Sequence, residues 1–162
     1  MSGGSRVIVA IRVKAPPERA FQVFVDEIGL WWRPNPLFSF TPRDPGLLSF
    51  EPGASGRLIE TRAGGKVFEV GKVRAWEPPV RLVFGFRQAS FTPEQDTEVE
   101  VRFEPVDEGE TRVTITHTGW DSIPREHVAR HGFPNTILLT RLGEWWRSLL
   151  SAYNDNLGAS GG

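Results

Sequence analysis

Hydrophobic and polar residues alternate at the start of the chain, between residues 6 and 14. Aliphatic side chains occupy every second position from Val7 to Val13, and arginine or lysine lies at several positions between and beside them. Successive side chains of a strand point to opposite faces, so this period of two is typical of a strand with one buried face. We therefore predict the first strand here, ended by the two prolines at positions 16 and 17.

The period changes directly after these prolines. Between Ala20 and Ile28 the hydrophobic residues recur at a spacing of three to four. That spacing places them on one stripe of a helix, and a proline such as Pro17 is well tolerated in the first turn of a helix. The pattern predicts an amphipathic helix that begins at Pro17, with Trp31 and Trp32 on a short helical segment behind it.

Glycine and proline then mark turns about every ten residues as far as Gly109, a spacing that favours an antiparallel meander. The strands predicted between these turns are 47–51, 56–62, 67–76, 80–87, 97–105 and 111–118. In the segment 97–105, valine and phenylalanine occupy one face, whereas three glutamates and an arginine occupy the other. One face of the sheet should therefore be buried and the other exposed to water.

A second amphipathic segment, residues 135–153, brings Leu138, Leu142, Leu149 and Tyr153 onto one stripe. A helix of this length can cover the buried face of the sheet. The predicted order is one strand, one helix, six strands and one long helix, which is an α+β fold. We expect a single domain over residues 6–157, with flexible tails at 1–5 and 158–162.

Composition narrows the classes of function. The chain has 162 residues, of which 39% are hydrophobic, and its formal net charge is −1. A charge near zero gives no electrostatic reason to expect nucleic acid as a partner. The sequence contains no cysteine, no apolar run long enough to span a bilayer and no signal-like segment at its start. We therefore expect a cytoplasmic protein without integral membrane association, and the sequence leaves its oligomeric state open.

One histidine falls on a buried face. In the predicted strand 111–118, His117 shares its side with Val113 and Ile115. A buried imidazole without a partner is costly, so His117 is either a core residue bonded to a neighbouring strand or water, or a polar group that looks into a cavity. The sequence offers no nearby Ser, Asp and His constellation and no paired carboxylates at a spacing that would make His117 catalytic. We predict a cavity-facing group that orients a ligand, name no catalytic residue, and lean against an enzyme.

Two other motifs give weaker evidence of a functional site. His127 and His131 lie four residues apart on what could be a helix after Pro124, but no zinc-binding motif accompanies them. The pair Gly64-Gly65 lacks the pattern of a phosphate-binding loop and indicates a hairpin turn. We expect neither a metal nor a cofactor.

Several local motifs, in their order along the chain, resemble the START-like (SRPBCC) superfamily. They look most like the subfamily named after the activator of heat-shock protein 90 ATPase. The residues that carry the resemblance are Pro17, Phe21, Phe24, Trp31-Trp32, Pro52-Gly53, Gly56-Arg57, Gly71, Val73, Pro78-Pro79, Arg81-Leu82, Thr97-Glu98-Val99 and Thr116-His117-Thr118-Gly119-Trp120. The match covers nearly the whole chain, but it gives no guide to the loops at 33–46 and 88–96.

The resemblance implies a helix-grip fold, in which a curved seven-stranded antiparallel sheet wraps around the long C-terminal helix. It also implies a cavity between sheet and helix that takes a hydrophobic or amphipathic small molecule, such as a lipid. The side chains that we expect to line this cavity are Trp31, Trp32, Phe38, Phe84, Phe86, Phe103, His117, Trp120, Leu138, Leu142 and Trp145. Adjacent tryptophans on one helical segment cannot both face the core, so either Trp31 or Trp32 should reach the cavity mouth.

Two alternatives to simple ligand binding stay open. Some relatives perform cyclase, aromatase or hydrolytic chemistry in the same cavity. The subfamily name also implies a chaperone partner, for which the acidic outer face of residues 97–105 is the place to look. Of the two interpretations of that face, we favour an ordinary solvated sheet surface.

Overall fold

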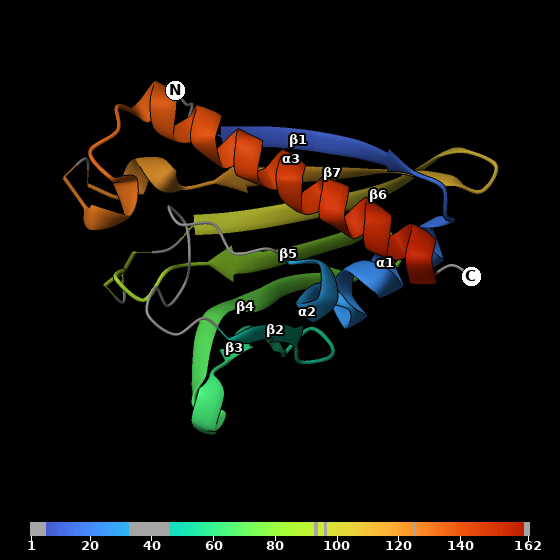
Figure 1. The fold of residues 1–162 in the computed structure, drawn as a ribbon, viewed down its shortest axis with the longest axis horizontal. Helices are drawn as coiled ribbons and strands as arrows, with labels where there is room; N and C mark the ends of the chain where they lie inside the picture. Colours follow the sequence, from blue (N-terminus) through green and yellow to red (C-terminus); the bar gives the residue numbers. More distant parts are fainter. Residues whose placement is uncertain (1–5, 33–45, 93, 96, 125, 161–162) are drawn as a thin grey trace.

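The computed structural model describes residues 6–32, 46–92, 94–95, 97–124 and 126–160. The elements are β1 (Arg6–Val13), α1 (Pro17–Asp26), α2 (Ile28–Trp31), β2 (Leu47–Phe50), β3 (Arg57–Thr61), β4 (Val67–Glu77), β5 (Arg81–Phe86), β6 (Thr97–Asp107), β7 (Glu110–Thr118) and α3 (Asn135–Ser160) (Figure 1). This is the predicted order of strand, helix, six strands and helix, with short 3-10 turns at Ala63–Gly65, Trp120–Ser122 and Val128–Arg130.

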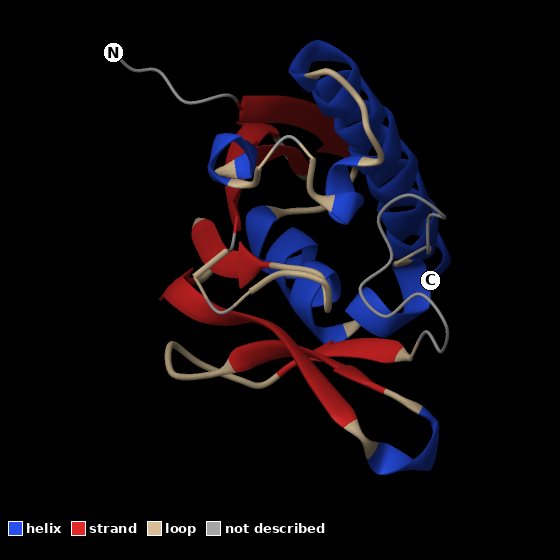
Figure 2. Ribbon diagram, turned by 90° about the vertical axis from the view of Figure 1, so that its left-hand side faces the viewer, coloured by secondary structure: helices blue, strands red, loops and turns tan. Residues whose placement is uncertain are grey.

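The described strands form one seven-stranded antiparallel sheet in the order β1-β7-β6-β5-β4-β3-β2. The helices lie on one side of this curved sheet, and α3 runs across it (Figures 1 and 2). The helix-grip prediction is therefore confirmed. Consecutive strands pair as hairpins from β2 to β7, whereas β1 pairs with the last strand, β7.

The alternation seen in the sequence decides which side chains enter the core. In β6, Val99, Val101 and Phe103 are buried, and the glutamates between them are more exposed. In β7 the register places His117 opposite Val7 of β1 and opposite Val99 of β6. A shift of one residue would turn each of these buried side chains to the solvent, so burial fixes the register.

The sheet bends where β4 and β5 meet. A Cβ atom built on Gly71 would collide with the backbone carbonyl of Gly85, so glycine is needed at 71 for the two strands to approach this closely. Register irregularities in β4, against both β3 and β5, accompany this bend. The hairpin predicted at Gly64-Gly65 is confirmed, because both glycines adopt positive φ values between the paired strands β3 and β4.

The first helix is shorter than its hydrophobic pattern predicts. It ends at Asp26, where the N–H of Glu27 still donates to Val23 O at 3.1 Å. The chain then turns into the separate four-residue helix α2, which carries Ile28 and Trp31 into the core. The hydrophobic spacing continues across this break, so the spacing alone did not show it.

The last helix is longer than predicted and continues past Tyr153 to Ser160. Leu157 lies one turn after Tyr153 on the same stripe and is 4% exposed, so burial continues over the added turns. Gly158 therefore lies in the helix and not in the tail that we expected to begin there. The end of α3 is tied to α1, because the Tyr153 hydroxyl donates to Ala20 O at 2.6 Å.

Candidate functional site

Aromatic side chains from β5, β7, α3, the residue after α2 and the 3-10 turn Trp120–Ser122 meet between the sheet and α3. We call this group the tryptophan end, and it consists of Trp32, Phe86, His117, Trp120, Trp145 and Trp146. Trp32 packs against three of these rings: its centroid lies 5.4 Å from that of Trp145, 5.6 Å from that of Trp146 and 6.4 Å from that of Phe86. Trp32 is partly exposed, while the other members are buried.

The two adjacent tryptophans at the end of α2 differ in burial. Trp31 is fully buried, and its indole nitrogen lies 3.3 Å from the backbone oxygen of Phe24, to which it donates. Trp32 follows the last residue of α2, and its backbone is extended, which turns its ring towards α3. Of the two, Trp32 is therefore the one that joins the core to the surface.

His117 is fully buried at the tryptophan end and makes all of its contacts with protein groups. The indole N–H of Trp146, on α3, donates to His117 Nδ1 at 3.0 Å. Thr97 Oγ1 lies 2.8 Å from His117 Nε2, and the Thr97 hydroxyl donates to Phe86 O at 2.6 Å. The indole N–H of Trp120 also donates towards Nε2, at 3.2 Å.

These contacts decide the protonation state of the ring. A neutral imidazole has one N–H and one lone pair. Indole N–H groups point at both ring nitrogens, that of Trp146 at Nδ1 and that of Trp120 at Nε2. Because the Thr97 hydroxyl donates to Phe86 O, its oxygen is left to accept, so we place the ring proton on Nε2, facing Thr97 Oγ1, and Nδ1 accepts the shorter indole bond from Trp146. A second proton on Nδ1 would face the Trp146 N–H. Burial lowers the pKa of His117 to about 3, so the ring is neutral at physiological pH.

The hydrogen bonds of His117 determine whether it could act as a general base. A general base needs an accessible lone pair, but the lone pair of His117 is already engaged by Trp146. No carboxylate is hydrogen-bonded to the ring among the contacts of the described residues. His117 therefore has the partners of a histidine that ties β7 to α3, and its contribution to ligand binding stays a prediction.

A buried amide at this end has no such partner. Gln88 follows β5 and is 5% exposed, yet its Nε2 atom has no hydrogen-bond partner among the described residues. The backbone carbonyl of Gln88 accepts from the N–H of Phe91 at 3.0 Å, and Phe91 packs edge-on against Trp120 at 5.7 Å. The backbone of Gln88 therefore lies at the same end of the fold as Trp120. A buried donor without a partner is unusual in native proteins and is a candidate contact for a bound molecule.

The structure places the predicted site residues in two groups. Trp32, Phe86, His117, Trp120 and Trp145 come together at the tryptophan end. The other described members, Trp31, Phe84, Phe103, Leu138 and Leu142, are buried at 1% exposure or less. Phe103 packs with Phe21 and Phe24 near α1. Phe38 lies outside the described residues. Whether any of these residues contacts a ligand stays a prediction.

Three residues of this end were missing from the predicted set: Trp146, Thr97 and Gln88. Alternation could have found Thr97, because it shares the buried face of β6 with Val99. Helical spacing could have found Trp146, one turn after Leu142. Nothing in the sequence marks Gln88, whose interest comes only from its burial without a partner.

The histidine pair at 127 and 131 does not lie on an α-helix. A 3-10 turn, Val128–Arg130, separates the two residues. His127 caps this turn by accepting from the Ala129 N–H at 3.0 Å, and His131 has a positive φ of 53°. Among the described residues, no group of three or more His, Cys, Asp or Glu side chains could hold a metal ion.

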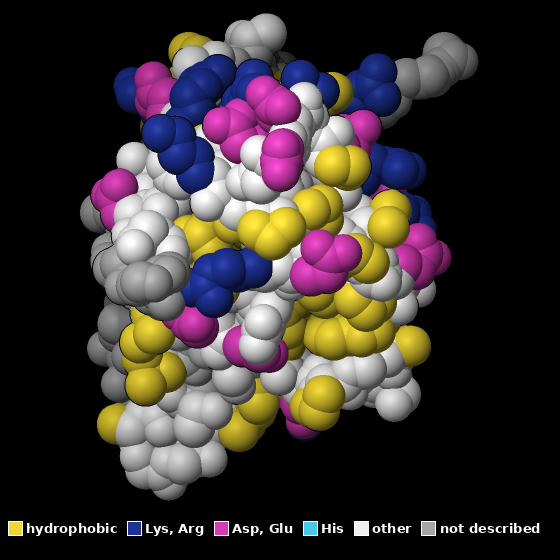
Figure 3. Space-filling model, turned by 90° about the vertical axis from the view of Figure 1, so that its right-hand side faces the viewer, with side chains coloured by type: hydrophobic (Ala, Val, Ile, Leu, Met, Phe, Trp, Pro, Cys, Tyr) yellow, Lys and Arg dark blue, Asp and Glu magenta, His cyan; other side chains and the backbone are white. Residues whose placement is uncertain are grey.

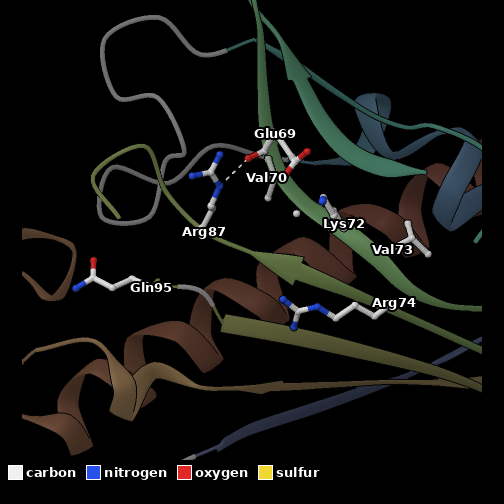
Figure 4. Close-up of a pocket in the computed structure, with 8 residues that line it drawn as sticks. Glu69, Val70, Lys72, Val73, Arg74, Arg87 and Gln95 are labelled. Carbon is white, nitrogen blue, oxygen red and sulfur yellow. Dashed lines mark hydrogen bonds between the residues drawn. The ribbon is translucent and has the colours of Figure 1, made fainter. Parts of the chain in front are cut away.

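A hollow of about 500 Å³ lies over β4 and β5, away from α3 (Figure 4). Its basic side chains are Lys72, Arg74 and Arg87. Arg74 pairs with Glu98 at 2.9 Å, and Arg87 donates to the backbone oxygen of Glu69 at 3.0 Å. Protein groups thus already hold both guanidinium groups, which is typical of a solvated sheet surface.

Comparison with known proteins identifies the family. Residues 14–144 match the model of the Activator of Hsp90 ATPase homolog 1-like protein family. The chain belongs to this family. This match confirms the family resemblance that the sequence motifs indicated. No curated protein matches the chain.

In the described part of the structure, no helix is long and apolar enough to cross a membrane.

Solved structures share the fold at low sequence identity. An HSP90 activator from Plasmodium falciparum is 19% identical and has a TM-score of 0.67, with 96% of this chain and 97% of that chain covered. The Aha1 dimer from Colwellia psychrerythraea is 20% identical, with a TM-score of 0.62 and coverages of 94% and 96%. The self-sacrificing resistance protein CalC from Micromonospora echinospora is 22% identical, with a TM-score of 0.61 and coverages of 97% and 96%. These similarities establish the fold.

Proposed function

We propose that this member of the family binds a hydrophobic or amphipathic small molecule at the tryptophan end. The carrying observation is that the buried side-chain nitrogen of Gln88 has no partner among the described residues. Gln88 lies two positions after Phe86, which belongs to an aromatic cluster that one partly exposed tryptophan connects to the surface. Sites for apolar ligands combine aromatic walls with a few placed polar groups. Here the aromatic rings would hold the apolar body, and the Gln88 amide would donate to an oxygen of the ligand.

The partly exposed Trp32 gives the ligand its path. Its neighbours Trp145 and Trp146 are buried and lie on the regular helix α3, whereas Trp32 lies just beyond the end of α2. A rotation of the Trp32 side chain therefore disturbs less regular structure than a movement of either neighbour. We place the mouth of the site at Trp32 for this reason.

The other functions have weaker support. The neutral, fully engaged imidazole of His117 speaks against acid–base chemistry at this end. A chaperone partner is supported by family membership and by the names of the activators with the same fold. On the outer face of β6, however, Glu98 and Glu100 are already paired with arginines, which leaves less uncompensated charge for a partner.

A pair of probes that differ in one oxygen tests the proposal. 2-Acetylnaphthalene carries a carbonyl, and 2-ethylnaphthalene has the same ring without an acceptor. We expect the ketone to bind roughly fivefold more tightly than the hydrocarbon, because one buried hydrogen bond contributes about 1 kcal/mol. In the Gln88→Leu variant the two probes should bind alike. Titrations followed by the indole N–H signals in NMR spectra give both the affinity and the location.

When a probe binds, the indole N–H signals of Trp32 and Trp145 should shift. Each signal is assigned with the corresponding Trp→Phe variant. The Gln88→Leu variant should be at least as stable as the wild type to urea, because it removes an unsatisfied buried donor. A loss of stability would instead reveal a structural role for the amide. Failure of both probes to bind, or an unchanged preference for the ketone in Gln88→Leu, would refute the proposal.

A further inference from the structure

A separate apolar cleft of about 330 Å³ opens between α1 and the turn that joins β4 to β5. Its apolar walls are Phe21, Val25, Trp76, Pro78 and Pro79. In Figure 3, hydrophobic side chains gather on this side of the molecule and acidic side chains border them. The volume is within the lower part of the range of small-molecule sites, about 300 to 1,000 Å³.

The wall of this cleft is aromatic and partly open. Phe21 is buried and meets Trp76 edge-on, with ring centroids 5.4 Å apart and planes at 86°. Trp76 remains partly exposed, so part of its ring can receive a ligand. The electron-rich face of an indole attracts cations, and tryptophan does so best among the aromatic side chains. The cleft therefore suits a ligand with both an apolar and a cationic part.

The rim carries carboxylates that have no counter-charge. Glu18, Gln22 and Asp26 also line the cleft, and their spacing of four places them along one side of α1. No hydrogen bond or ion pair in the described structure engages the side chain of Glu18 or Asp26. Arg81, near the same turn, is instead held by Glu100 at 2.7 Å and Glu77 at 3.6 Å. The two rim carboxylates therefore remain available to a cation.

The position of Asp26 adds to this field. It is the last residue of α1, and the last turn of this helix contains no basic residue. The C-terminal end of a helix carries a partial negative charge, so a cation is favoured there and an anion is not. A bound cation at the rim would balance both the carboxylates and the helix end.

We propose that this cleft is a second ligand site, specific for an organic ammonium with an apolar body, such as an arylalkylamine. The aromatic or alkyl part lies against Phe21, Trp76 and the two prolines. The ammonium group lies at the rim, where Glu18 and Asp26 accept its hydrogen bonds. This site is at the α1 end of the fold and does not share residues with the tryptophan end.

Three probes of equal length separate charge from apolar contact: 4-phenylbutylamine, 4-phenylbutanol and 4-phenylbutyrate. We expect the amine to bind roughly tenfold more tightly than the alcohol, because each of two exposed ion pairs contributes up to about 1 kcal/mol. The butyrate should bind most weakly. Calorimetry gives the affinities, and the Trp76 indole signal, assigned with Trp76→Phe, should shift with the amine.

The decisive variant is Glu18→Gln/Asp26→Asn, which should reduce amine affinity to that of the alcohol and leave the alcohol unchanged. The matched control is Glu104→Gln/Glu108→Gln, which removes two exposed carboxylates elsewhere and the same net charge. Equal affinities for amine and alcohol, or an equal loss in both double variants, would overturn the proposal. Shifts at Trp32 and Trp145 in place of Trp76 would also overturn it, whereas Gln88→Leu should leave amine binding unchanged.

Discussion

The buried imidazole of His117 makes the stability of this protein depend on pH in a predictable direction. Burial lowers its pKa in the folded state from 6.5 to about 3. The unfolded chain binds a proton near pH 6.5, but the folded chain does not, so unfolding takes up a proton below that pH. Stability is therefore greatest above pH 6.5 and falls as the pH falls towards 3.

The magnitude follows from the same two pKa values. Each pH unit below 6.5 lowers the free energy of unfolding by about 1.4 kcal/mol, so His117 alone should cost roughly 3 kcal/mol between about pH 7.5 and pH 4.5. The structure explains the direction, because a second ring proton would be buried and would face the Trp146 N–H. Carboxylates also titrate near the acidic end of this range, so the comparison must be made between variants.

Urea unfolding of the wild type and of His117→Gln at both pH values isolates this contribution. The variant keeps a hydrogen-bonding side chain at residue 117 but cannot take up the proton. We expect the difference in stability between the two proteins to shrink by roughly 3 kcal/mol at the lower pH. In NMR spectra of the folded wild type, the ring signals of His117 should stay constant over the same range. A stability difference that does not change with pH, or a ring that titrates near pH 6.5, would refute the reasoning.

Other predictions concern single contacts and can be measured by urea unfolding at neutral pH. Trp146→Phe should cost about 1 to 3 kcal/mol more than Trp145→Phe, because both remove the same ring volume but only the first leaves His117 Nδ1 without its donor; equal costs would show that this bond contributes nothing. Leu157→Ala should cost about 2 to 4 kcal/mol if α3 is packed beyond Tyr153, and a cost near zero would mean that its last turns are frayed. Tyr153→Phe should lose about 1 kcal/mol through the bond to the backbone of α1, and an unchanged midpoint would argue against that bond.

Patterning predicted most of the fold, and it failed where the hydrophobic period continues across a change in the backbone. The alternation in residues 111–118 placed His117 on the buried face, and the structure confirms that face. The stripe from Ala20 to Ile28 predicted one helix, but the backbone breaks after Asp26 and resumes as α2. Both arrangements bury the same apolar residues, so the sequence pattern cannot distinguish them.

The candidate site was predicted less completely than the fold. Aromatic richness drew attention to Trp32 and Trp145, which do meet. The same signal also selected Phe103, which packs near α1, because a hydrophobic ring has the same periodicity wherever along the sheet it lies. The position of a residue along its strand decides at which end of the sheet its side chain lies. The register with the neighbouring strands fixes that position.

The sequence by itself determined the element types, the buried faces and the family, because these depend on local periodicity and on motifs in a fixed order. The tertiary structure alone decided what each polar group meets. His117 is neutral because tertiary packing buries it, and Trp146, from a helix later in the chain, donates to it. Gln88 is of interest because its buried side-chain nitrogen has no hydrogen-bond partner among the described residues. The apolar cleft at Trp76, with its acidic rim, likewise requires α1 to pack beside a turn that is distant in sequence. Partners of this kind are set by packing in three dimensions, and no spacing along the chain encodes them.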